Sequence, residues 1–81
     1  MKIGLFSVRD RVADDCIALF EAKNPGIAMR GYLAFIKDSR PKHTAEEDYE
    51  LVHFGYWDNE TMEFSILPRP QVVTRGGPID E

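Results

Sequence analysis

The run from residue 47 to residue 64 constrains the fold of this chain most strongly, because it has the pattern of a β-hairpin. Two segments rich in aromatic and β-branched residues, 49–57 and 61–67, flank a short polar turn at residues 58–60. Such side chains favour strands, and a polar turn between two strand-like runs indicates a hairpin. Four of the nine aromatic residues fall within the first segment, so we expect it to be the structural spine of the domain.

Alternation along residues 49–57 places apolar side chains on both faces of the predicted strand. One face carries Glu50, Val52, Phe54 and Tyr56, and the other carries Tyr49, Leu51, His53, Gly55 and Trp57. Because neither face is purely polar, the strand is predicted to be central in its sheet and covered on both sides. Glycine in the middle of a strand indicates a bulge or the close approach of another backbone, which we expect at Gly55.

The preceding part of the chain predicts two strands and a helix. Residues 2–8 and 16–22 have strand-like composition. Asn24 followed by Pro25 is a helix start, because the Asn side chain can accept from free N–H groups and proline suits the first helical position. The helix is expected over residues 25–37. A polar loop follows over residues 38–47, where Thr44 has the spacing of an N-cap for a short helix.

These elements give an α+β fold of order β-β-α-β-β, a small antiparallel sheet with one helix packed on a face. Residues 1–67 form this single domain. Pro68 and Pro70 do not suit the interior of a sheet, and residues 75–78 are rich in glycine and proline. Residues 68–81 are therefore predicted to be a flexible Pro/Gly-containing C-terminal tail.

The small size of the chain favours self-association. A domain of 81 residues buries only about 60% of the surface of its unfolded chain, which leaves a thin core. The predicted helix has an apolar arc of about 200°, wider than that of an ordinary surface helix. We therefore predict a homodimer that uses either this arc or a sheet edge. The arc consists of Ala28, Met29, Gly31, Tyr32, Leu33, Phe35 and Ile36.

Charge is distributed unevenly along the chain, although the net charge is −4. Residues 1–43 carry eight Lys/Arg and five Asp/Glu, or +3, whereas residues 44–81 carry two and nine, or −7. Arg30 and Lys37 lie on one stripe of the helix, and Arg40 and Lys42 continue it. A phosphate backbone can follow such a stripe. The alternative is an ordinary solvated helix face followed by a basic loop.

No pattern of residues indicates catalysis, a metal site or a cofactor. Cys16 is the only cysteine, so no disulfide can form within one chain. It is interpreted as a buried structural thiol. His43, Glu46, Glu47 and Asp48 lack the spacing of a closed metal site. His53 has apolar neighbours and no nucleophile beside it in sequence, so a partly buried structural histidine is favoured over a general base. We expect a protein that is not an enzyme.

Several passages resemble the small non-structural DNA-binding protein of microviruses, the gokushovirus-type single-stranded DNA phages. The resemblance spans residues 2–64. Met62 departs from the pattern, since the family commonly has glycine there. The matching passages are Val8-Arg9-Asp10, Phe20, Ala28-Met29-Arg30-Gly31-Tyr32, and Glu47 to Asp58 running on to Thr61.

The resemblance implies a bacteriophage non-structural protein, absent from the virion, that works in the host cytoplasm. It implies binding of single-stranded DNA during viral genome replication or packaging. The physical candidates are Arg30, Lys37, Arg40 and Lys42 for phosphates, and Tyr56 and Trp57 for base stacking if they are exposed. The alternative is an acidic protein-interaction module that regulates a viral or host replication protein through residues 46–50 and 60–63. No membrane association is expected, because no apolar run approaches the ~20 residues of a spanning helix.

Overall fold

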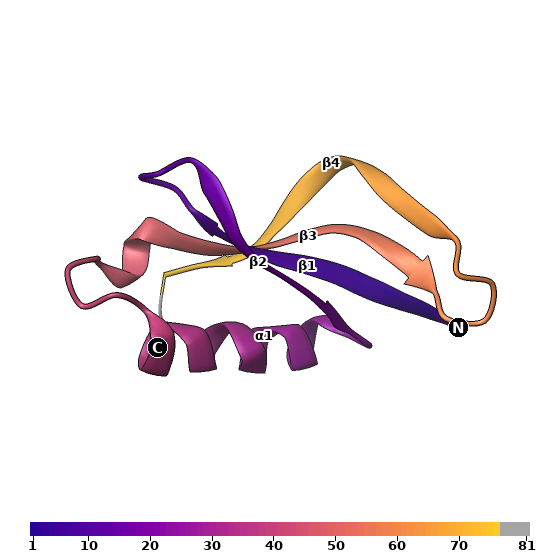
Figure 1. The fold of residues 1–81 in the computed structure, drawn as a ribbon, viewed down its shortest axis with the longest axis horizontal. Helices are drawn as coiled ribbons and strands as arrows, with labels where there is room; N and C mark the ends of the chain where they lie inside the picture. Colours follow the sequence, from indigo (N-terminus) through magenta and orange to yellow (C-terminus); the bar gives the residue numbers. More distant parts are fainter. Residues whose placement is uncertain (77–81) are drawn as a thin grey trace.

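The computed structural model describes residues 1–76, which form a four-stranded antiparallel sheet with a helix across one face (Figure 1). This confirms the α+β class and the order β-β-α-β-β. The α-helix continues directly into one π-helical segment, Phe35–Ser39, and a 3₁₀ turn, Glu46–Asp48, precedes the third strand. The main elements are β1 (Lys2–Asp10), β2 (Asp15–Ala22), α1 (Pro25–Ala34), β3 (Tyr49–Asp58) and β4 (Phe64–Arg75).

The strands lie in the order β2-β1-β3-β4, so β1 and β3 are central and β2 and β4 are the edges. The predicted hairpin is formed by β3 and β4, joined by residues 59–63. Within this loop Met62 has a φ of 64°, the left-handed region that glycine adopts most easily.

The prediction of a tail from Pro68 is wrong for residues 68–75, which belong to β4. Proline is tolerated there because β4 is an edge strand, and one side of its backbone needs no partner. The pairing of β3 with β4 shifts register between His53 and Gly55, and the segment containing both prolines arches away from the sheet (Figure 1). The domain boundary after residue 67 therefore does not hold. Residues 77–81 of the predicted tail lie outside the described residues.

The helix begins as predicted and ends differently. Asn24 Oδ1 accepts a hydrogen bond from the N–H of Ile27 at 2.9 Å, and Pro25 occupies the first turn. The α-helix stops at Ala34 and the π-helical segment carries the chain to Ser39, two residues beyond the predicted end. Thr44 does not act as an N-cap. Its hydroxyl donates to the carbonyl of Pro41, 2.6 Å away.

The core lies between α1 and the sheet, and it takes up most of the apolar arc of the helix. Ala28, Tyr32 and Ile36 are buried, and Met29, Leu33 and Phe35 pack half-buried against them. The helix arc therefore does not need a second subunit to cover it. From the strands, the core receives Phe6, Val8, Ala22, Tyr49 and Leu51.

Gly55 lies at a β-bulge, as predicted from the sequence. The register of β1 on β3 shifts between Leu5 and Phe6, and Phe54 is the extra residue between His53 and Gly55. A Cβ atom at position 55 would lie 2.7 Å from the carbonyl oxygen of Ser65 in β4. Glycine is therefore required here by the close approach of two backbones.

Tyr32 connects the helix to the ends of β3 and β4. Its buried hydroxyl lies 2.7 Å from the carbonyl oxygen of Gly76 and 3.1 Å from that of Tyr49. Burial, the main cause, raises the pKa of this phenol from 10.0 to about 12. The neutral phenol is therefore the form that the folded chain retains.

We expect the free energy of unfolding to fall as pH rises from 10 to about 12, because Tyr32 ionises more easily in the unfolded chain than in the folded one. A shift of this size corresponds to a loss on the order of 2–3 kcal/mol. Urea denaturation at pH 8, 10 and 11.5 measures it. Tyr32→Phe should remove this part of the dependence, and Tyr56→Phe, the control, should retain it. Equal pH dependence in Tyr32→Phe and the wild type would contradict the assignment.

Candidate nucleic-acid interface

The segment from Lys23 to His43, here called the helical layer, concentrates the positive charge of the protein. It contains five Lys/Arg and one Asp/Glu, a net charge of +4, so the rest of the chain carries −8. The segment covers α1, the π-helical segment and the loop that follows, and all of α1 lies on one side of the sheet (Figure 1). The five cations are Lys23, Arg30, Lys37, Arg40 and Lys42.

Four of these cations are available to a ligand. Lys23, Arg30, Lys37 and Lys42 are exposed, and none of them forms an ion pair with another residue of the range 1–76. Lys23 was not predicted from the sequence, although its place just before the helix cap was a usable signal. An unpaired exposed Lys or Arg can neutralise a phosphate and release the counterion condensed on the nucleic acid there.

Arg40 differs from the other cations because its guanidinium group is partly used within the protein. Its Nη1 donates to the carbonyl of Thr44, and the residue is half-buried. Its Nε is buried without a hydrogen-bond partner among the described residues. Arg40 therefore closes the loop after the π-helical segment, which is a structural role that the sequence prediction did not include.

The two predicted stacking residues lie on opposite faces of the sheet, because neighbouring residues of a strand alternate. Tyr56 is on the side of α1, 36% exposed, with its ring edge-on to His53 at 4.7 Å. Trp57 is half-buried on the other side, stacked on Phe64 at 6.2 Å. The structure thus places Tyr56 on the same side as Arg30, and Trp57 away from the cations.

His53 and Cys16 have environments that differ from each other in burial. His53 is 9% exposed, its Nε2 lies 2.9 Å from the carbonyl oxygen of Gly55, and its ring stacks on Phe6. These contacts agree with the interpretation as a structural histidine. Cys16 was predicted to be buried and is exposed, because its side chain lies on the side of the sheet that α1 does not cover.

The acidic residues do not form one continuous surface. Glu50 is only 4% exposed, and its carboxylate lies 3.7 Å from Arg9 and 3.6 Å from Arg75. The hydrogen bond and the charge of Asp14 raise the pKa of Arg9, so this guanidinium stays charged beside Glu50. The other acidic groups of the second half of the chain, within the described residues, lie at opposite ends of β3, residues 46–48 before it and residues 58–63 at its far end.

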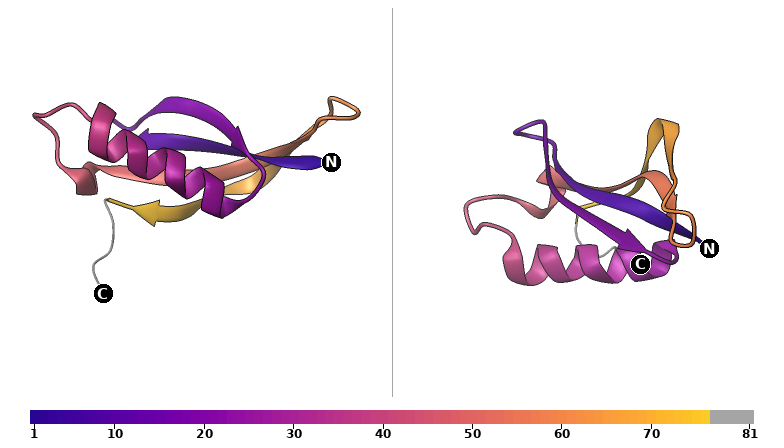
Figure 2. Two further views of the ribbon diagram at one scale, coloured as in Figure 1. Left: turned by 90° about the horizontal axis from the view of Figure 1, so that it is seen from below. Right: turned by 45° about the vertical axis from the view of Figure 1, so that its right-hand side comes forward.

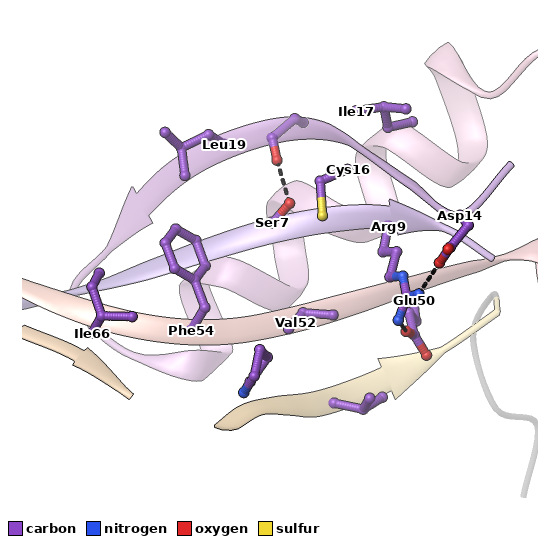
Figure 3. Close-up of a pocket in the computed structure, with 13 residues that line it drawn as sticks. Ser7, Arg9, Asp14, Cys16, Ile17, Leu19, Glu50, Val52, Phe54 and Ile66 are labelled. Carbon is purple, nitrogen blue, oxygen red and sulfur yellow. Dashed lines mark hydrogen bonds and ion pairs between the residues drawn. The ribbon is translucent and has the colours of Figure 1, made fainter. Parts of the chain in front are cut away.

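The face of the sheet opposite α1 is an apolar groove of about 880 Å³, here called the trough. Ser7, Glu50, Val52 and Phe54 form its floor, and Leu19 and Ile66 project from its two sides (Figure 3). The prediction that β3 is covered on both sides holds only in part. Glu50 and Val52 on the trough side are buried, but only the α1 side has a second layer among residues 1–76. The alternating apolar residues of β2 and β4 were the signal for this surface in the sequence.

Residues 1–76 contain no group of three or more His, Cys, Asp and Glu side chains that could hold a metal ion. No helix in this part of the chain has the length and apolar character needed to cross a membrane.

Comparison with known proteins gives one match. The family model described as Phage ORF5 protein matches residues 3–78, which include every strand and helix described above except the first residue of β1. No curated protein and no solved structure matches the chain.

Proposed function

Because the chain belongs to the Phage ORF5 protein family and is thus a phage protein, we propose that it binds single-stranded DNA through its helical layer. The binding serves viral genome replication or packaging in the host cytoplasm, and the protein stays out of the virion. The choice of single-stranded DNA and of this stage comes from the resemblance to the microvirus protein.

The observation that supports the proposal is the separation of charge between the helical layer and the rest of the chain. The layer carries +4 in a protein of net charge −4, and four of its five cations are exposed without an ion pair among residues 1–76. A polyanion is attracted to the local field of such a face rather than to the net charge of the protein.

The geometry of the layer suits a single extended strand. Arg30 and Lys37 are seven residues apart, two helical turns, which places them about 10 Å apart along the axis. The helical part of the layer, residues 25–39, is roughly 20 Å long, and Lys23 and Lys42 lie just before and just after it. Such a track serves three or four phosphates, and Tyr56 on the same side of the sheet offers a ring to a base.

The proposal is tested by the salt dependence of DNA affinity. Anisotropy of a labelled 20-nucleotide oligo-dT is measured between 50 and 300 mM NaCl. Three or four phosphate contacts predict a slope of log affinity on log salt of about −2 to −3, hence a loss of roughly 20- to 50-fold between 50 and 200 mM. A duplex of the same length serves as the comparison ligand.

Two results would contradict the proposal, namely an affinity that does not change with salt and an absence of binding at 50 mM NaCl. The second result would favour the acidic protein-interaction module, acting through Glu46 and Glu47 or through Glu60 and Glu63. Protein partners that remain bound in a nuclease-treated lysate of infected cells would then identify that function.

A further inference from the structure

The trough leaves large apolar side chains in contact with solvent. Leu19 is 71% exposed, Ile66 63%, Val72 52% and Ile17 45%, and all four line the same groove. A sheet normally buries each apolar face against another layer, and a contiguous exposed apolar surface marks an interaction site. The α1 side has its layer, so the trough is the face that lacks one.

The charge of the trough indicates an apolar partner rather than a nucleic acid. Glu50, on its floor, is held between Arg9 and Arg75, and Arg9 also bonds to Asp14. Two arginines and two carboxylates cancel, which leaves no excess of positive charge for a phosphate backbone. The side walls consist of aliphatic side chains, which suit another apolar protein surface.

The sheet face that carries the trough is large enough to contribute most of a standard dimer interface. Four strands at a spacing of about 4.8 Å, each contributing roughly eight residues of about 3.3 Å, give a face of about 500 Å² in projection. This projected face is about 60% of the ~800 Å² per partner of a standard interface, and the protruding side chains of Leu19 and Ile66 add further accessible area.

The shape of the trough suits a second copy of the same chain. The β1–β2 hairpin rises on one side of it and the arch of β4 on the other (Figure 2). When two such surfaces cross near a right angle about a two-fold axis, the walls of each copy enter the trough of the other. We propose that the trough is the interface of a homodimer in which the two sheets pack face to face.

The other two surfaces considered for self-association are less suitable. The apolar arc of α1 is already packed on the sheet. The edge of β4 contains Pro68 and Pro70, which cannot donate hydrogen bonds to a neighbouring strand. In a dimer packed through the trough, the two helical layers would lie on opposite outer faces.

Sedimentation velocity without DNA tests the proposal. The wild type is expected to be a dimer at 20–50 μM, and Leu19→Glu combined with Ile66→Glu is expected to weaken the dimer at least 100-fold. The control is Ile27→Glu, the same change at a 46% exposed position on α1, which should leave the dimer unchanged. Circular dichroism checks the fold of each variant.

Cys16 gives a second measurement that needs no variant. It is the only cysteine, it lines the trough, and it is exposed in the isolated chain. Its alkylation by iodoacetamide should slow as the wild-type concentration rises through the dissociation constant. A wild type that is monomeric at 500 μM, a dimer insensitive to both trough substitutions, or an alkylation rate independent of concentration would each overturn the proposal.

Discussion

Replacement of Arg30 and Lys37 together by Glu is expected to weaken binding of single-stranded DNA at least 50-fold at 50 mM NaCl. Both side chains are exposed on the helical layer, and neither forms an ion pair among residues 1–76. The double reversal removes two phosphate contacts and places two negative charges on the DNA track, so attraction becomes repulsion. Anisotropy titration with labelled oligo-dT measures the change.

A matched control separates the position of these charges from their number. Lys2 and Arg69 are exposed and lie on strands β1 and β4, outside the helical layer. Both double reversals change the net charge by −4, from −4 to −8. We expect Lys2→Glu with Arg69→Glu to weaken binding by less than about fivefold, through long-range repulsion alone. Equal losses in the two variants would contradict a DNA track on the helical layer.

Gly55→Ala is expected to lower the free energy of unfolding by about 3 kcal/mol, the upper end of the usual cost of overpacking. The new Cβ would lie 2.7 Å from the Ser65 carbonyl oxygen and 3.3 Å from the Ile66 Cα, and both are backbone atoms. Because a backbone cannot rotate away as a side chain can, β3 and β4 must separate. Urea denaturation followed by circular dichroism measures the loss.

Gly31→Ala is the control for this substitution. Gly31 is exposed in α1, and a Cβ there would meet only the Phe20 ring at 3.7 Å, an ordinary contact. Alanine favours the helix, so we expect a gain of about 0.5–1 kcal/mol. The same chemical change should thus have opposite signs at the two positions. A neutral Gly55→Ala would show that the bulge has more room than the structure gives it.

Much of the fold could be predicted because the decisive residues act locally. Asn24 and Pro25 define a helix start through their own side chains, and this helix starts where they predict. The aromatic and β-branched run of β3 identified a central strand, and Gly55 within it identified the bulge. The alternation of β3 alone did not reveal that only one face of the sheet has a second layer.

The errors arose where a distant part of the fold decides the outcome. Pro68 and Pro70 argue against a central strand, but nothing local to them shows that β4 is an edge that tolerates them. Cys16 is exposed because its side chain lines the trough, and nothing local to it shows that this face lacks a second layer. The conversion of the helix to a π-helical segment after Ala34 also has no signal in the spacing of its side chains.

In the candidate site, too, the features that depend on local sequence could be predicted, and those that depend on distant residues could not. Four of the five cations of the helical layer could be predicted because they lie on one continuous segment, and Lys23 was missed. The partial use of Arg40 depends on Thr44, across a loop that the sequence left unstructured. Tyr56 and Trp57 are neighbours in sequence, but adjacent residues of a strand face opposite sides of the sheet. The two rings therefore cannot belong to one binding surface, and the alternation along the strand already indicated this.

A backbone NMR titration of the ¹⁵N-labelled protein with oligo-dT at 50 mM NaCl tests the central claim most directly. The account predicts that chemical-shift changes concentrate in the amides of residues 23–43, with the largest around Arg30 and Lys37, and that the trough residues of β2 and β4 stay unchanged. Changes confined to the trough, or to the acidic residues 46–48 and 58–63, would contradict it.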